Sequence, residues 1–169
     1  MEFLKKRKIV VAVGILLIIV LGVAIGAHST SQSSGKANTL TTELPSVSAT
    51  PGVAPVIGKP VGAAPASLIS KDIIVGSGAA AITSSTVTAQ YVVMSWKTGV
   101  VYQTSWTAQP FTAPLANLIP GWQQGIPGMK IGGRRLFIIP PALAYGAQGA
   151  GNIPANETLV FVVDLLAVK

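Results

Sequence analysis

The stretch from Leu118 to Gly149 constrains the fold more than any other part of the chain, because its local structural preferences follow one another in a fixed order. A short helix is expected over Ile119–Ile126, since Pro120 suits the first turn of a helix. A glycine-rich reversal follows, and then the β-forming run Arg134–Ile139, which a pair of prolines ends. This order predicts one short helix followed directly by a strand.

Further runs along the chain have the composition or the alternation of β-strands. They cover Asp72–Val75, Thr86–Trp96, Val100–Gln103 and Thr158–Val168. A three-residue turn separates the second run from the third, so these two are expected to form a hairpin. Strands on both sides of one short helix predict an α+β fold, in which an antiparallel β-sheet wraps around the helix.

Alternation along the last two strands predicts which side chains face the core. The inward candidates are Leu136, Ile138, Leu159, Phe161, Val163 and Leu165. Phe137 and Ile139 would then lie on the outer surface, which Val92, Met94 and Val162 are expected to share. Such residues are either scattered apolar side chains of the ordinary kind or a contiguous patch that binds a partner or unfolded clients.

The N-terminus has the composition of a membrane signal. Residues 1–8 form a basic segment, and residues 9–26 form an uncharged run of 18 residues. As a helix this run would be about 27 Å long, close to the hydrocarbon thickness of a bilayer. We expect a retained transmembrane anchor with its basic end in the cytoplasm and the rest of the chain outside. The alternative is a signal peptide that is cleaved, which would give a secreted protein.

Residues 27–70 differ in composition from both neighbouring segments. They are rich in Pro, Ser, Thr and Ala, with five prolines and no aromatic residue. A segment of this kind buries too little apolar surface to offset its chain entropy, so we expect a flexible linker. The folded domain is then expected to span residues 71–169. An anchor followed by such a linker suits a bacterial surface protein.

Composition excludes several classes of function. The chain has no Cys, one His and five carboxylates, so disulfides and thiolate metal sites are impossible and neither a metal nor a cofactor is expected. The net charge of +7 includes four cations in residues 1–8. The folded part therefore lacks the basic surface of a nucleic-acid-binding protein, and no such partner is expected.

Several motifs occur in the order of one known family. They are GWQQG at residues 121–125, GMKIGGRR at 128–135, IPPALAYG at 139–146 and IPANETLVF at 153–161. With this order the chain resembles the FKBP-type peptidyl-prolyl cis-trans isomerases over about residues 72–169. The resemblance implies an isomerase that accelerates rotation about X-Pro bonds by binding the proline in an aromatic pocket. Its substrates would be proline-containing peptides or unfolded exported proteins.

The resemblance also implies which residues form that pocket. Trp122 would be its floor, Ile119 would donate its N–H to a substrate carbonyl, and Tyr145 would offer its hydroxyl. The full set of implied catalytic residues is Tyr91, Tyr102, Gln103, Phe111, Trp122, Tyr145 and Phe161. The implied substrate-binding residues are Leu118, Ile119 and Ile153.

One departure from the family pattern concerns the pocket itself. The family has an Asp where this chain has Gln103. Binding of macrolides such as tacrolimus or rapamycin is therefore expected to be weak. A module that binds peptides or acts as a chaperone, with the pocket but without turnover, is the alternative interpretation. The oligomeric state does not follow from the sequence.

Overall fold

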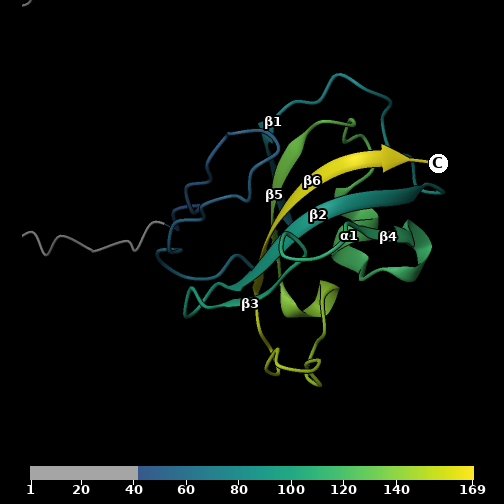
Figure 1. The fold of residues 1–169 in the computed structure, drawn as a ribbon. Helices are drawn as coiled ribbons and strands as arrows, with labels where there is room; N and C mark the ends of the chain where they lie inside the picture. Colours follow the sequence, from purple (N-terminus) through teal and green to yellow (C-terminus); the bar gives the residue numbers. More distant parts are fainter. Residues whose placement is uncertain (1–41) are drawn as a thin grey trace, which may run out of the picture. The chain divides into compact units, whose positions relative to one another are not determined.

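A computed structural model describes residues 42–169, which lie within one compact unit (Figure 1). The predicted basic segment, the predicted membrane helix at residues 9–26 and the first part of the predicted linker lie outside the described residues. No helix in the described part of the chain is both long and apolar enough to cross a membrane.

The core of the structure is one six-stranded antiparallel sheet. The strands are β1 (Ile69–Ile74), β2 (Thr86–Ser95), β3 (Val101–Thr104), β4 (Phe111–Pro114), β5 (Arg134–Ile139) and β6 (Leu159–Val168). Their order is β1-β5-β6-β2-β3, and β4 also pairs with β2. The short helix α1 (Pro120–Gly125) lies against one face, and two 3-10 turns cover Leu115–Asn117 and Pro141–Leu143.

The predicted fold class, an antiparallel sheet with one short helix, is confirmed. The predicted hairpin is the β2–β3 pair, and β5 has the predicted bounds. Strand β4, which has four residues and ends in a proline, was not predicted. It forms because Thr86–Ala89 at the start of β2 leaves an edge free, while β3 pairs with the later residues Val92–Met94.

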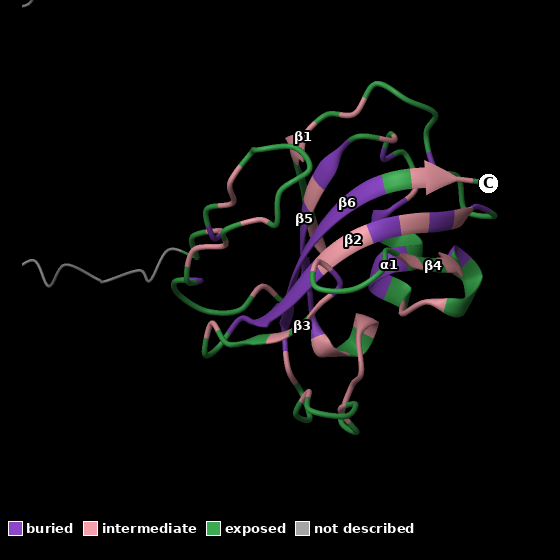
Figure 2. Cartoon of the chain, in the orientation of Figure 1, coloured by how far each residue is buried: buried purple, intermediate pink, exposed green. Residues whose placement is uncertain are grey.

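The inner face of the sheet forms the main core together with α1. Figure 2 shows the buried residues running along β5, β6 and β2. The helix approaches β5 so closely that two of its positions require glycine. A Cβ at Gly121 would lie 2.5 Å from Ile139 Cγ2, and one at Gly125 would lie 2.5 Å from Phe137 Cε1. Both distances are shorter than any real carbon contact, so larger residues would push the helix away.

The predicted facing of β5 is wrong. Phe137 and Ile139 are completely buried in the inner core against α1, whereas Leu136 and Ile138 face the other side of the sheet. The reason is register: Phe137 lies directly opposite Phe161, and directly opposed residues of an antiparallel pair share one face.

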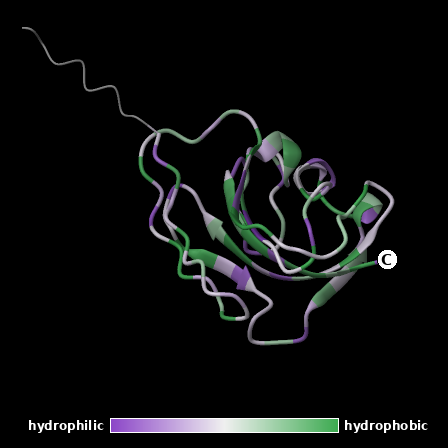
Figure 3. Ribbon diagram, turned by 90° about the horizontal axis from the view of Figure 1, so that it is seen from above, coloured by the Kyte–Doolittle hydropathy of each residue, from purple (hydrophilic) through white to green (hydrophobic). Residues whose placement is uncertain are grey.

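The residues of the predicted outer patch are therefore not exposed to solvent. Its other members, Val92, Met94 and Val162, are buried as well. The outer face carries a second apolar cluster, formed by Met94, Trp96, Leu136, Ile138, Val160 and Val162. Figure 3 shows hydrophobic residues, in green, on the strands.

The prediction of a flexible linker is wrong from residue 42 onward. Residues 42–63 double back on themselves through the bridges Glu43–Val61 and Val47–Ile57, and we call this segment the N-terminal hairpin. Figure 1 shows it in dark blue on the side of the sheet away from α1. Leu44, together with Val47 and Ile57, packs on the outer apolar cluster. Tertiary contacts thus order a segment whose local sequence has little tendency to fold.

A buried ion pair lies beneath the hairpin. The guanidinium of Arg134 is fully buried and binds both oxygens of Asp164, at 2.6 Å from Nε and 2.8 Å from Nη2. It also donates to two hairpin carbonyls, at 2.8 Å to Ser48 and 2.6 Å to Val53. Removing one partner of such a buried pair costs about 3–5 kcal/mol.

The burial of Phe137 leads to a stability prediction. Phe137→Thr is expected to lower the free energy of unfolding by about 3 kcal/mol or more, because the change leaves a cavity and buries a hydroxyl. Leu166→Thr on β6 is the control, since Leu166 is 43% exposed, and it is expected to change stability by less than about 0.5 kcal/mol. Urea denaturation measures both, and equal stability of the two variants would contradict the burial.

Candidate functional site

A cleft of about 280 Å³ opens on the inner side of the sheet, beside α1. It is lined by Tyr91, Val93, Gln103, Phe111, Asn117, Leu118, Ile119, Trp122, Tyr145, Ile153 and Phe161. All of the predicted site residues except Tyr102 are in this set. Val93 and Asn117 were not predicted: Val93 resembles any core residue of an alternating strand, and Asn117 lies in a 3-10 turn with no motif.

Helix α1 holds Trp122 at the base of the cleft. The N–H of Trp122 donates to the carbonyl of Ile119 at 2.9 Å, which closes the first turn behind Pro120. At the other end of the helix, Arg135 donates to the carbonyl of Gly125 at 2.7 Å and forms an ion pair with Asp72 at 2.6 Å. The helix is thus tied to β5 and β1. The Trp122 side chain is 4% exposed.

Three aromatic rings surround the Trp122 indole edge to face. The ring centroids lie 5.6 Å from Phe161, 5.9 Å from Tyr91 and 6.1 Å from Phe111, with interplanar angles of 86°, 87° and 82°. Tyr91 and Phe111 also meet edge to face, at 5.8 Å and 84°. Aromatic pairs favour this geometry, and each ring restricts the rotation of its neighbours. The cleft therefore has a fixed aromatic base.

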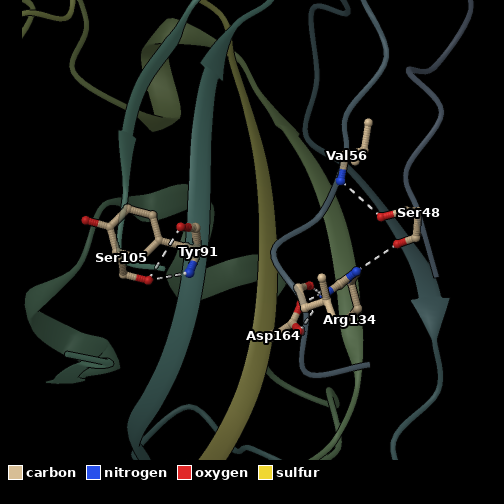
Figure 4. Close-up of polar contacts among 7 residues, drawn as sticks. Ser48, Val56, Tyr91, Ser105, Arg134 and Asp164 are labelled. Atoms are coloured by element: carbon tan, nitrogen blue, oxygen red, sulfur yellow. Dashed lines mark hydrogen bonds and ion pairs between the residues drawn. The ribbon is translucent and has the colours of Figure 1, made fainter. Parts of the chain in front are cut away.

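Ser105 fixes the backbone of Tyr91 where the edge of β2 changes partner. The N–H of Tyr91 donates to Ser105 Oγ at 2.8 Å, and the N–H of Ser105 donates to the Tyr91 carbonyl at 3.0 Å (Figure 4). The Ser105 hydroxyl in turn donates to the Gln90 side chain. Tyr91 lies between the part of β2 that pairs with β4 and the part that pairs with β3. The bonds to Ser105 replace the missing strand-to-strand hydrogen bonds there, so the backbone of Tyr91 stays fixed.

Tyr145 stands at the rim on the loop after the 3-10 turn Pro141–Leu143. Gly146 has a φ of 56°, and its N–H donates to the Pro141 carbonyl at 2.9 Å, which turns the chain sharply after Tyr145. Burial raises the pKa of the Tyr145 phenol above its ordinary value. Burial, and then the nearby Tyr145, raises the pKa of the Tyr91 phenol. Both hydroxyls therefore keep their protons at neutral pH and can donate hydrogen bonds.

The other polar groups of the cleft are neutral. Gln103 and Asn117 are exposed at its edge. In the described part of the chain, no protein acceptor takes the N–H of Ile119. Gln123 holds the preceding loop by donating to the Leu118 carbonyl at 2.6 Å. The cleft thus offers a fixed, free backbone donor beside an apolar base.

Tyr102 is the one predicted site residue that does not line the cleft. The pairing of β2 with β3 joins Val93 to Gln103 and Met94 to Val101, so Tyr102 is left without a partner at an irregularity of the register. Gln103, opposite the inward Val93, faces the cleft instead. The Tyr102 carbonyl accepts a hydrogen bond from Asn152 at 3.0 Å, which ties the loop near Ile153 to β3.

Within residues 42–169, no group of three or more His, Asp and Glu side chains is arranged to hold a metal ion. The chemistry that this cleft supports is the binding of an apolar group against aromatic rings, with a backbone N–H and a phenol as donors.

Comparison with known proteins identifies relatives over most of the described region. Residues 78–166 match the family model of the FKBP-type peptidyl-prolyl cis-trans isomerases. The chain is 48% identical over 114 residues to a probable FK506-binding protein of Corynebacterium glutamicum, which covers 67% of the chain and 97% of that protein. It is 45% identical over 119 residues to an FK506-binding protein of Streptomyces anulatus, covering 68% of the chain and 96% of that protein.

Solved structures show the same similarity. FkpA from Escherichia coli superposes with a TM-score of 0.57 and 40% identity, over 60% of this chain and 48% of FkpA, so the chain spans about half of that relative. AtFKBP13 superposes with a TM-score of 0.57 and 33% identity, over 63% of this chain and 96% of that protein. The residues that match the family model include the whole lining of the cleft.

Proposed function

Because the chain belongs to the FKBP-type peptidyl-prolyl cis-trans isomerase family and is an isomerase of that type, we propose that its cleft binds the prolyl residue of the substrate. The observation that carries this proposal is the base of the cleft, where Trp122 is held edge to face by three other rings. A small apolar ring such as the pyrrolidine of proline fits against this surface. The family match favours the isomerase over the alternative of a binding module without turnover.

The proposed mechanism uses binding alone. Rotation about an X-Pro amide has a barrier of about 18–20 kcal/mol, because resonance keeps the bond planar. The twisted amide has lost its resonance, so its carbonyl carries less charge and needs less hydration than that of the planar amide. An apolar cleft that excludes water favours the twisted form, and only such a difference in affinity lowers the barrier.

Two donors would hold the substrate while the bond rotates. The N–H of Ile119 would bind a carbonyl on one side of the proline, and the hydroxyl of Tyr145 would bind from the rim. Tyr91, Phe111 and Phe161 would keep the prolyl ring in place against Trp122. No covalent intermediate and no cofactor takes part in these steps.

Turnover of a proline tetrapeptide by residues 42–169, followed in a protease-free assay, tests this mechanism. We expect isomerisation well above the thermal rate. Tyr145→Phe is expected to lower kcat/KM by about threefold to tenfold, since a neutral hydrogen bond contributes about 0.5–1.5 kcal/mol. Tyr102→Phe is the matched control and should leave kcat/KM unchanged, because Tyr102 does not line the cleft. Absence of turnover by the folded protein would refute the mechanism.

We further propose that the cleft binds tacrolimus-like macrolides weakly. The relatives of Corynebacterium glutamicum and Streptomyces anulatus are named for binding FK506. In this chain the polar group at one edge of the cleft is the neutral Gln103 rather than a carboxylate. A neutral amide is a weaker acceptor than a carboxylate for a hydroxyl of the ligand.

Gln103→Asp is therefore expected to tighten macrolide binding by about twofold to thirtyfold, as a hydrogen bond to a charged group contributes about 1.5–3 kcal/mol and a neutral one about 1 kcal/mol. Isothermal titration calorimetry with tacrolimus measures the change. Gln109→Asp, in the exposed loop after β3, adds the same charge outside the cleft and should have no effect. Equal affinity of the Gln103→Asp variant and the parent would exclude a role for this position.

For the whole chain we propose a single-pass membrane protein whose folded part lies outside the cytoplasm and acts on exported or surface proteins. Support comes from the uncharged run at residues 9–26 after a basic segment. Protease added to intact bacterial cells or spheroplasts that make the full chain is expected to degrade the folded part, while a cytoplasmic marker protein survives. Protection of both until lysis would argue against this location. N-terminal sequencing of the product distinguishes an anchor from a cleaved signal peptide.

A further inference from the structure

The N-terminal hairpin is a defined structural unit and lies outside the residues that match the family model. Its two legs are joined by backbone hydrogen bonds, among them Glu43 N–H to Val61 O at 3.1 Å and Gly58 N–H to Ser46 O at 2.8 Å. Ser48 and Val56 are joined twice, through a backbone bond of 3.0 Å and through Ser48 Oγ, also at 3.0 Å (Figure 4). The hairpin thus has an internal structure of its own.

The hairpin has one apolar side that faces the sheet and one exposed side. Leu44, Val47 and Ile57 pack against the outer cluster. Val56 is 75% exposed, and Val53 is 55% exposed. The inward residues replace water over the outer face of β5, β6 and β2, where side chains would otherwise form a large apolar surface.

The strands beneath the hairpin are the ones that carry two walls of the cleft. On β6, Phe161 faces the cleft, and its neighbours Val160 and Val162 face the hairpin side. On β2, Tyr91 faces the cleft, and Met94 lies in the outer cluster. Phe161 and Tyr91 are therefore separated by only one to three positions along their strands from side chains of the outer cluster, which the hairpin covers.

Arg134 joins the hairpin to these strands. Its guanidinium binds Asp164 on β6 and the carbonyl of Ser48 (Figure 4). It also donates to the carbonyl of Val53. A second bond runs from Trp96 Nε1 to the carbonyl of Gly62, at 3.3 Å. Because these donors bind main-chain carbonyls, they fix the backbone of the hairpin independently of its side chains.

We propose that the N-terminal hairpin braces the rear of the catalytic cleft, and that Arg134 is a positioning residue that locks the hairpin onto β6. The rings of Tyr91 and Phe161 keep their places because the strands that bear them are buried on both faces. Loosening the hairpin would let these strands shift, and small displacements of a binding site reduce catalytic efficiency strongly. This inference rests on the proposed function of the cleft.

The test compares two valines of the hairpin in the full chain. Val47 faces the sheet. Val47→Ser is expected to raise the KM for a proline tetrapeptide about threefold to tenfold, with a smaller change in kcat. The assay is run at a temperature where circular dichroism shows that the variant is folded. It should also speed hydrogen exchange within the hairpin. Val56→Ser makes the same change at an exposed position and is expected to leave KM, kcat and exchange as in the parent.

A double variant, Arg134→Met with Asp164→Leu, removes the lock without leaving a buried charge unpaired. It is expected to raise KM and to speed hairpin exchange, as Val47→Ser does. If the hairpin of either variant exchanges faster while KM and kcat stay at the parental values, the hairpin only stabilises the domain and the proposal is wrong. Unchanged exchange in both would equally refute it. A parent without turnover would instead refute the proposed function.

Discussion

The buried guanidinium of Arg134 is the group on which the arrangement of the domain depends. It has no exposure to solvent, and its hydrogen bonds go to β6 and to two points of the N-terminal hairpin. A charge in that position is tolerable only if all of these partners are present, since desolvation is costly. The pair with Asp164 therefore fixes which face of β5 is outward and requires a segment that covers this face.

The facing of β5 determines the two sides of the molecule. With Arg134, Leu136 and Ile138 outward, Phe137 and Ile139 must face inward, where they meet the two glycines of α1. The close contact of the helix with β5 sets the depth at which Trp122 lies. The position of the cleft floor thus follows from the same strand that carries the buried ion pair on its other face.

Much of the site could be predicted from the sequence, whereas its surroundings could not. The order of the motifs around Trp122 and Tyr145 indicated the cleft, because each motif places its residue by a local turn or a short helix. Alternation could not predict which residues of β5 face inward. Leu136–Ile139 are all apolar, so either alternate set could face the core. Tyr102 packs against the inner core without lining the cleft, and the irregular register that leads to this cannot be recognised in a strand of four residues.

The hairpin was missed for a different physical reason. Its sequence is rich in proline and lacks aromatic residues, so its own propensity favours an open chain. Its order comes from apolar contacts with a sheet face and from donors that belong to residues more than thirty positions away. Reasoning from one segment at a time cannot include such contacts.

The distribution of charged residues suits a reaction that needs no charged catalytic group. Residues 98–129 and 136–156, which contain most of the cleft lining, include no Asp, Glu, Lys or Arg. The charged pairs Arg134–Asp164 and Arg135–Asp72 lie on the strands, where they fasten the hairpin and the helix. Since amide rotation is favoured by a dry, rigid and neutral site, the charges serve to fix the scaffold, while in the proposed mechanism the aromatic rings bind the substrate. If the cleft acts as proposed, its catalytic power depends on how firmly the surrounding strands are held.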